Sequence, residues 1–291
     1  MKKITALLTA LFSIITHHPL QAQHKENKDN SLLWRISGKG LTKPSYLFGT
    51  IHLICKDDYL WTGKMKQSLD NSEKVCFEMD LDDQGVMMEV AAGLLDKSGK
   101  KLKDYFTPDQ YELLRQYFKD SIGMEISMFE QLKPVALQTM IATSSVSCAN
   151  SISYEDSIMK IALNAKKEIL GLEAPKEQIA VLESIPTDTV IQQLLDEIQH
   201  KNKDDGEYAQ LISAYKNQDL SKLYSLITSA KDLGSNMDAF LDDRNKKWIV
   251  RMPSKMKQSS VFFAVGAGHL PGENGIISLL RKEGYSVEPL K

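Results

Sequence analysis

The sequence lacks several patterns that identify common enzyme classes. It contains no His-Glu-x-x-His, no Gly-x-Ser-x-Gly elbow and no P-loop, and its three cysteines lack the spacing of a zinc ribbon. A serine hydrolase therefore has no nucleophile signature here. The formal net charge is −2 and no basic stripe is present, so nucleic-acid binding has no electrostatic footprint.

The N-terminal apolar run is too short to span a bilayer. It extends from Ile4 to Ile15, follows two lysines and precedes a small residue, Ala22, which is typical of a secretory signal peptide. No cysteine lies at the cleavage point, so we expect no bacterial lipid anchor. We expect a periplasmic or secreted protein without a transmembrane span, organised as a signal peptide over 1–22, a flexible tail over 23–30 and a domain over 31–291.

Apolar runs of strand length alternate with helical segments, which favours an α/β fold. The expected strands cover residues 32–38, 44–53, 74–81, 167–174, 260–269 and 285–290. A helical region covers about 84–166, and a second helical block covers about 176–252, with helix starts near Thr187 and Ser235. In the first block, Thr107 and Pro108 predict a helix start and Gly123 a helix end.

Two histidines end strand-like runs with the same spacing. Gly49 precedes His52 in "FGTIH", and Gly266 precedes His269 in "VGAGH". Open α/β sheets bind their ligands at strand ends, and glycine there permits close approach of backbone. Either histidine alone reads as an ordinary strand-end residue, whereas the shared spacing favours a joint site in one cleft.

Two glutamates end the other strand-like runs, Glu78 in "CFEMD" and Glu173 in "GLEA". A carboxylate that interrupts a buried strand needs a cation, a metal or an exit to water. Asp80 points to the same side as Glu78 if the strand continues. The alternative is that the two glutamates cap neighbouring helices.

Arg244 lies within an apolar helical stripe that includes Phe240, Trp248 and Met252. An arginine in such a stripe either extends outward to water or reaches a buried carboxylate, for which its rigid fork is suited. The second reading predicts a contact with Glu78 or Glu173.

The cysteines predict one disulfide if the protein is exported, because an oxidising compartment favours the bond. Cys76 lies in a strand that reads as buried, where a reduced thiol packs well. Cys55 and Cys148 lie in polar segments that are free to approach each other. We therefore expect a Cys55–Cys148 bond with Cys76 reduced, against the alternative of three reduced cysteines.

Five segments in order, "YLFGTIHL", "CFEMD", "GLEAPKEQ", "DDRNKKW" and "VGAGHLPGENGIISLLRKEGY", resemble the TraB/GumN family. That family is related to TIKI-type metal-dependent proteases and to the erythromycin-esterase/ChaN-like (EreA/ChaN-like) superfamily. The resemblance implies two pseudo-repeated sheet-containing halves packed with helices, with a helical block inserted between them. It matches His52 and His269 to the motif histidines, and the polar positions between them to Glu78, Glu173 and Arg244. Ala174 departs from the hydroxyl residue found in many relatives.

The primary hypothesis is an exported metal-dependent hydrolase, specifically a peptidase. His52 and His269, with at least one of Glu78 and Glu173, would hold Mn, Co or Zn. The remaining glutamate would act as general base, and Arg244 would orient a carboxylate or bind the oxyanion. The alternative is a non-catalytic exported protein that binds a peptide, metal complex or haem-like ligand in the same cleft, and a plain scaffold is a third reading. The substrate, a peptide or small molecule, is not specified by the sequence, nor are the metal and the oligomeric state.

Overall fold

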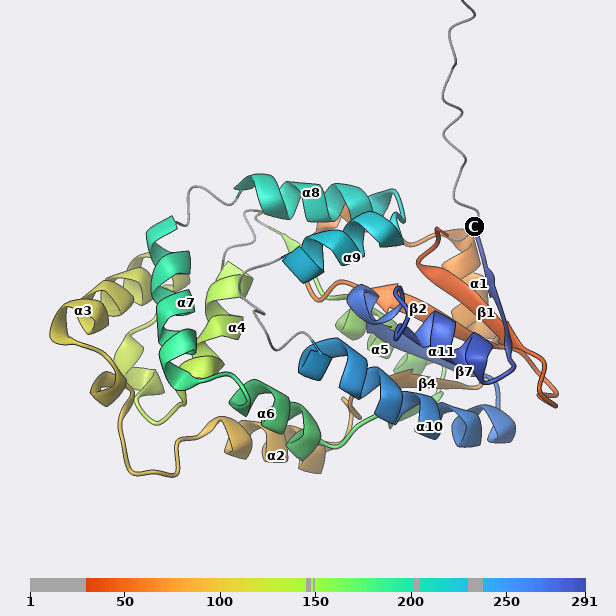
Figure 1. Ribbon diagram of the computed structural model, residues 1–291, viewed down its shortest axis with the longest axis horizontal. Coiled ribbons are helices and arrows are strands. Elements are labelled where there is room, and N and C mark those ends of the chain that lie inside the picture. Colours follow the sequence, from red (N-terminus) through yellow and green to blue (C-terminus); the bar gives the residue numbers. More distant parts are fainter. Residues whose placement is uncertain (1–29, 145–147, 149, 201–204, 230–237) are drawn as a thin grey trace, which may run out of the picture.

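The computed structural model describes residues 30–144, 148, 150–200, 205–229 and 238–291 (Figure 1). The expected signal peptide over 1–22, nearly all of the tail and the helix start expected near Ser235 lie outside these ranges. Within them, no helix combines the length and apolar character needed to cross a membrane.

Six strands form one mixed sheet in the order β6-β4-β7-β2-β1-β8. They are β1 (Leu33–Ser37), β2 (Ser45–Thr50), β4 (Lys74–Phe77), β6 (Glu168–Gly171), β7 (Val261–Gly266) and β8 (Ser286–Pro289). The α/β class is confirmed. Strands from both expected halves join this single sheet, in which β2 of the first half pairs directly with β7 of the second.

The centre of the sheet is apolar on both faces. All six residues of β2 are buried, and β7 is buried over its first five. Such continuous apolar strands are typical of parallel sheets covered on both sides. β2 and β7 are parallel, with Thr50 opposite Gly266, so the two Gly-x-x-His motifs leave the sheet at the same edge.

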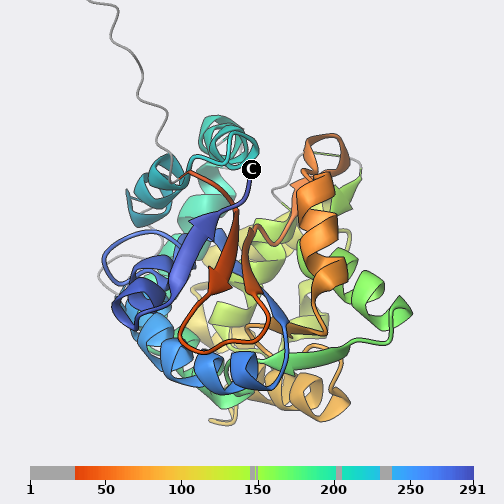
Figure 2. The ribbon, with the colours of Figure 1, turned by 90° about the vertical axis from the view of Figure 1, so that its right-hand side faces the viewer.

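Helices cover both faces of the sheet. α1 and α5 lie on one side, and α10 and α11 lie on the other (Figure 2). Their bounds are α1 (Gly63–Asn71), α5 (Tyr154–Asn164), α10 (Asp243–Gln258) and α11 (Ile276–Lys282). α8 (Asp205–Lys216) and α9 (Leu220–Ser229) pack together near the end of β2, where the Tyr215 hydroxyl donates to the Gly49 carbonyl at 2.9 Å.

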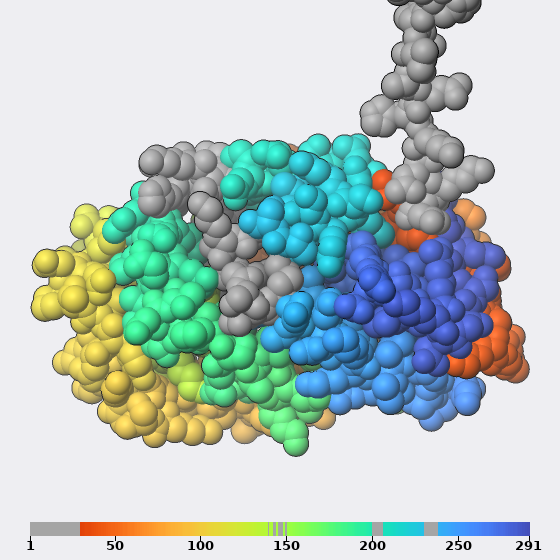
Figure 3. Space-filling model, in the orientation of Figure 1, coloured from red at the N-terminus to blue at the C-terminus, as the bar shows by residue number. Residues whose placement is uncertain are grey.

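A second hydrophobic core lies in a helical lobe at the other end of the molecule, drawn in yellow and green in Figure 3. Its buried side chains come mainly from α3 (Pro108–Tyr117), α4 (Pro134–Ser144) and α7 (Thr187–His200), with short 3-10 turns between them. α2 (Gln84–Leu94) packs against α6 (Pro175–Glu183) beside this lobe. α7, which follows β6 along the chain, thus packs in the lobe. In contrast, α5, which lies inside the expected helical region 84–166, packs on the sheet.

The start and end signals around α3 act as the sequence predicts. The Thr107 hydroxyl accepts from the Gln110 N–H at 3.3 Å, and Pro108 occupies the first turn. The helix continues as a π-turn over Phe118–Ile122 and ends at Gly123, whose φ of 76° is accessible to glycine at little cost.

The expected disulfide between Cys55 and Cys148 is confirmed, with a Cα–Cα distance of 5.8 Å. Cys55 ends β3 (Ile54–Cys55), which pairs with β5 (Ser151–Ile152) in a small second sheet. Cys76 is buried and reduced, as predicted, and burial raises the pKa of its thiol to about 12. The disulfide therefore joins the segment after His52 to the segment before α5.

Replacing both bonded cysteines, Cys55→Ala with Cys148→Ala, should lower the free energy of unfolding by about 2–4 kcal/mol, because the bond closes a long loop in the unfolded chain. Urea unfolding followed by circular dichroism measures the loss. Dithiothreitol should destabilise the wild-type protein and leave the double variant unchanged. Equal stability of the oxidised and reduced wild-type protein would contradict the expectation.

Candidate functional site

The two Gly-x-x-His motifs meet because glycine removes a clash between them. A Cβ on Gly49 would lie 3.0 Å from the Ala267 Cα and 3.1 Å from the Ala267 Cβ. After β7 the chain turns through a 3-10 turn, Ala267–His269, which buries His269. The glycine of the first motif therefore lets the turn of the second pack directly onto β2.

Arg244, near the start of α10, is the centre of a buried polar cluster. Its Nε and one Nη donate to both oxygens of Glu173, at 3.1 and 2.5 Å. The same Nη donates to Glu78 Oε2 at 2.6 Å, and the other Nη donates to His269 Nε2 at 3.2 Å. The predicted inward orientation is confirmed, and Arg244 contacts both glutamates.

Trp248 packs one helical turn after Arg244 and completes the underside of the cluster. Its Nε1 donates to Glu173 Oε2 at 3.1 Å, and its ring centroid lies 4.7 Å from the Arg244 Cζ. The ring also packs against His269 with centroids 4.4 Å apart. The spacing of four residues puts Arg244 and Trp248 on the same face of α10, so both face the sheet.

Asn245 determines which nitrogen of His269 carries a proton. Its Nδ2 donates to the carbonyls of His269 and Asn274 at 3.3 and 2.9 Å, so its Oδ1 must be the atom that faces the ring. His269 Nδ1 lies 2.8 Å from that oxygen and therefore donates to it. Burial lowers the pKa of His269 to about 3, against the attraction of Glu78. The imidazole is thus neutral, and its Nε2 lone pair faces Arg244.

The two glutamates differ in environment. Burial alone would raise the pKa of Glu78, but Arg244, His269, His52 and the Gly266 N–H together lower it to about 2. Glu78 Oε1 accepts from that N–H at 2.9 Å. In Glu173, whose side chain is 1% exposed, burial raises the pKa despite the hydrogen bonds from Arg244. Glu78 is therefore a firmly ionised, partly accessible carboxylate, and Glu173 is a buried anchor for Arg244.

His52 lies beside the cluster but bonds to a different residue. Its side chain is 78% exposed, and its Nδ1 lies 3.2 Å from Glu155 Oε1, which also accepts from the Thr50 hydroxyl at 2.7 Å. The hydrogen bond to Glu155 raises the pKa of His52 to about 9. The negative charge of Glu78 also raises the pKa of His52, and the positive charge of Arg244 lowers it.

The expected metal ligands fit a divalent ion by chemistry and only partly by position. His269 offers a neutral Nε2, Glu78 offers an ionised oxygen 3.8 Å from it, and His52 offers an exposed imidazole. Imidazole and carboxylate suit zinc, manganese or cobalt. In the described ranges, however, no three His, Cys, Asp or Glu side chains converge closely enough to hold an ion. Arg244 occupies the Nε2 lone pair of His269, and Glu173 is fully engaged beneath it.

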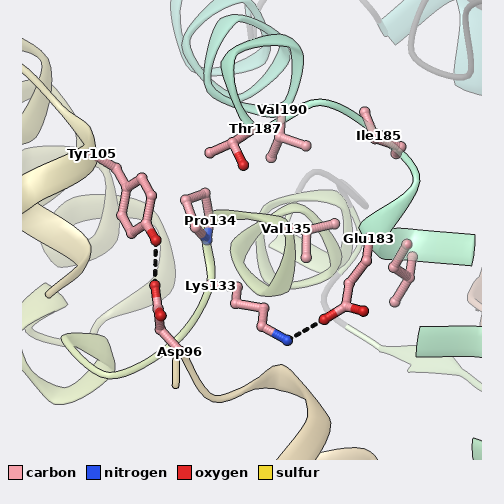
Figure 4. A pocket seen from close by; sticks show the side chains of 10 residues that line it. Asp96, Tyr105, Lys133, Pro134, Val135, Glu183, Ile185, Thr187 and Val190 are labelled. Atoms are coloured by element: carbon pink, nitrogen blue, oxygen red, sulfur yellow. Dashed lines mark hydrogen bonds and ion pairs between the residues drawn. The ribbon is translucent and has the colours of Figure 1, made fainter. Parts of the chain in front are cut away.

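A separate pocket of about 270 Å³ lies in the helical lobe (Figure 4). Lys133 pairs with Glu183 at 2.5 Å on one side of it, and the Tyr105 hydroxyl bonds to Asp96 on the other. Pro134 and Val135, with Leu182, Ile185 and Val190, supply its apolar lining. None of the lining residues belongs to the Arg244 cluster, and the sequence assigned a function to none of them.

Asp80 takes no part in the Arg244 cluster. One of its oxygens is buried without a hydrogen-bond partner. Burial, reinforced by Asp82 and Asp83, raises the pKa of Asp80 to about 6. Its carboxyl group is therefore a source of instability at neutral pH.

Replacing Arg244 with Met should cost about 3–5 kcal/mol of stability, because two buried carboxylates lose their common cation. Arg251→Met is the matched control, since Arg251 lies on the same helix and pairs with Glu177 but is 37% exposed. The control should cost about 1 kcal/mol or less. Chemical denaturation gives both values, and equal losses would show that burial of Arg244 carries no special weight.

Asp80→Asn should stabilise the protein at pH 7 and not at pH 4. Because the folded-state pKa of Asp80 is raised, the wild-type protein loses stability as the pH rises from about 4 to about 6. The gain of the variant should grow over that window and then level off at about 1 kcal/mol, allowing for solvent screening. Melting temperatures across pH test this, and a gain independent of pH would contradict it.

Comparison with known proteins finds distant relatives among the TIKI metalloproteases. The chain is 26% identical to the metalloprotease TIKI2 of Danio rerio, over 89% of its own length and 61% of the relative. It is 26% identical to the metalloprotease TIKI homolog of Amphimedon queenslandica, over 96% and 66%. For the metalloprotease TIKI1 of Homo sapiens the identity is 24%, over 91% and 63%. The chain thus spans less than two thirds of these relatives, and no solved structure matches it.

The family model covers nearly the whole described chain. It matches residues 32–289, from the residue before β1 to the end of β8, and so includes both histidine motifs and the Arg244 cluster. On this match, the chain belongs to the TraB/PrgY/gumN family.

Proposed function

We propose that the protein is an exported hydrolase that cleaves peptide bonds with the help of a divalent metal ion. One observation carries the proposal: a neutral imidazole with a held Nδ1 lies 3.8 Å from an ionised carboxylate, at His269 and Glu78. Metal-binding histidines typically have their other ring nitrogen held in this way. The distant TIKI metalloprotease relatives support the same class of reaction.

The residues divide into three roles under this proposal. His52, His269 and Glu78 would hold the ion, which supplies a polarised carbonyl and a water of lowered pKa. His52, whose pKa is raised to about 9, would lose a proton on binding the ion. With a pKa of about 3 for His269 and about 2 for Glu78, neither of these two needs to lose a proton near neutral pH before binding a cation. For the same reason both are weak proton acceptors, and they suit ligation better than general-base catalysis.

Arg244 and Glu173 form the support of the site. Glu173 fixes the guanidinium through two hydrogen bonds, and Trp248 packs against the plane of the guanidinium. The Nη atoms of Arg244 would stabilise the oxyanion or orient a substrate carboxylate once they release His269. The general-base role expected for a glutamate does not fall on Glu173, because its side chain is buried beneath Arg244.

Two independent features support the proposal that the protein is exported. The N-terminal run with its two lysines resembles a signal peptide that is cleaved after Ala22. The Cys55–Cys148 disulfide suits an oxidising compartment such as the periplasm or the extracellular space. We place the mature protein there without a membrane span, acting on a peptide or small molecule and not on nucleic acid.

The second candidate is a binding protein without turnover, for a peptide, metal complex or haem-like ligand. It is favoured because the polar groups of the cluster already bond to one another: Arg244 donates hydrogen bonds to His269, Glu78 and Glu173 together. In this case the cleft would recognise its ligand, and no water would be activated.

Metal analysis and peptide cleavage test the proposal. Protein purified without chelator should contain Mn, Co or Zn, and should cleave members of a peptide library when that ion is supplied. Glu78→Gln should lower kcat/KM by about 100-fold or more, because several kcal/mol of transition-state stabilisation depend on the bound ion.

Glu177→Gln is the control, since Glu177 pairs with Arg251 outside the cluster. It should retain turnover. Undiminished turnover in Glu78→Gln would exclude the proposed ligand set. Peptide binding without cleavage under all three metals would instead favour the binding protein.

A further inference from the structure

One acidic side chain outside the Arg244 cluster contacts the first histidine motif twice. Glu155 Oε1 accepts from the Thr50 hydroxyl at 2.7 Å and lies 3.2 Å from His52 Nδ1. Its other oxygen accepts from the Ser153 hydroxyl at 3.2 Å. The Glu155 side chain is 17% exposed. The position of the carboxylate is therefore set by two hydroxyl groups as well as by the imidazole.

The backbone that carries Glu155 is connected to the segment after His52. β3 and β5 pair antiparallel, and the Lys56 N–H donates to the Asn150 carbonyl at 2.9 Å. The Cys55–Cys148 disulfide joins the same two segments covalently. α5 begins two residues after β5, so Glu155 stands in the first turn of a helix whose approach is fixed by this pairing. That turn favours a carboxylate electrostatically.

The contact decides which edge of the His52 ring is available. Because Nδ1 faces Glu155, Nε2 lies on the opposite edge of the ring. The second motif has the same arrangement, with His269 Nδ1 held by Asn245 and Nε2 directed into the cluster. Both motif histidines thus have their Nδ1 held by a side chain from a helix, although one partner is Glu155 of α5 and the other is Asn245 of α10.

We propose that Glu155 is a positioning residue that orients His52 so that its Nε2 can bind the metal ion, and that the Cys55–Cys148 bond keeps Glu155 in register. The inference rests on the proposed metal-dependent function and adds a ligand-orienting residue outside both histidine motifs and the Arg244 cluster. Glu155 itself contacts neither ion nor substrate, and it acts through the imidazole. Partners of this kind typically contribute about 10–100-fold to metal affinity.

Glu155→Gln tests the proposal, because it keeps the size of the side chain and removes its charge. Asp156→Asn is the matched control: Asp156 is the next residue in the same helical turn, is exposed and does not contact His52. Mn²⁺ affinity is measured by electron paramagnetic resonance of free Mn²⁺. We expect Glu155→Gln to weaken binding about 10-fold or more and Asp156→Asn to leave it unchanged.

A second measurement does not depend on metal. Nuclear Overhauser contacts between the His52 ring protons and the Thr50 methyl group report ring orientation in the metal-free protein. They should be present in the wild-type protein and in Asp156→Asn, and should be lost in Glu155→Ala, which removes the acceptor that faces Nδ1. The Cys55→Ala, Cys148→Ala double variant should weaken both the contacts and the Mn²⁺ affinity. Melting curves verify that each variant is folded.

The outcomes separate this inference from the proposed function. Wild-type protein that binds Mn²⁺ while Glu155→Gln binds it equally well overturns the inference and leaves the proposed function intact. Wild-type protein that binds none of Mn²⁺, Co²⁺ and Zn²⁺ overturns the proposed function and, with it, the ligation part of the inference. In that case, ring contacts that persist in Glu155→Ala overturn the orienting role too, and their loss supports it.

Discussion

A single guanidinium group joins the ends of three strands. Arg244 bonds to Glu78 just after β4, to Glu173 just after β6 and to His269 just after β7. Two carboxylates this close in a buried site would repel each other and could not both remain ionised without a cation between them. The edge of the sheet, the start of α10 and the orientation of His269 therefore depend on the same positive charge.

The strands were the most predictable part of the fold, because short apolar runs bounded by glycine and proline have few other readings. The arrangement of the halves was less predictable. Apolar periodicity shows that a helix buries one face, but it does not show which core receives that face. The sequence therefore did not show that α7 packs in the helical lobe and α5 on the sheet.

Within the site, the buried charges were predictable and their neutral or distant partners were not. An apolar stripe interrupted by Arg244 and strands ended by Glu78 and Glu173 indicate a buried ion pair, because each charge needs a partner. Asn245 gives no comparable signal, because an asparagine next to an arginine is also common on the exposed face of a helix. Glu155 lies 103 residues from His52, and their contact depends on strand pairing that no local pattern reveals.

The position of β7 in the sheet determines when the centre of the sheet can assemble during folding. β7 lies between β4 and β2, yet it is the second-last strand along the chain. Without β7, the β1–β2 hairpin and the β4–β6 pair can form, but no strand joins them in the sheet. Pairings between residues so far apart are intrinsically slow to form. The centre of the sheet therefore cannot assemble until β7, Val261–Gly266, is available.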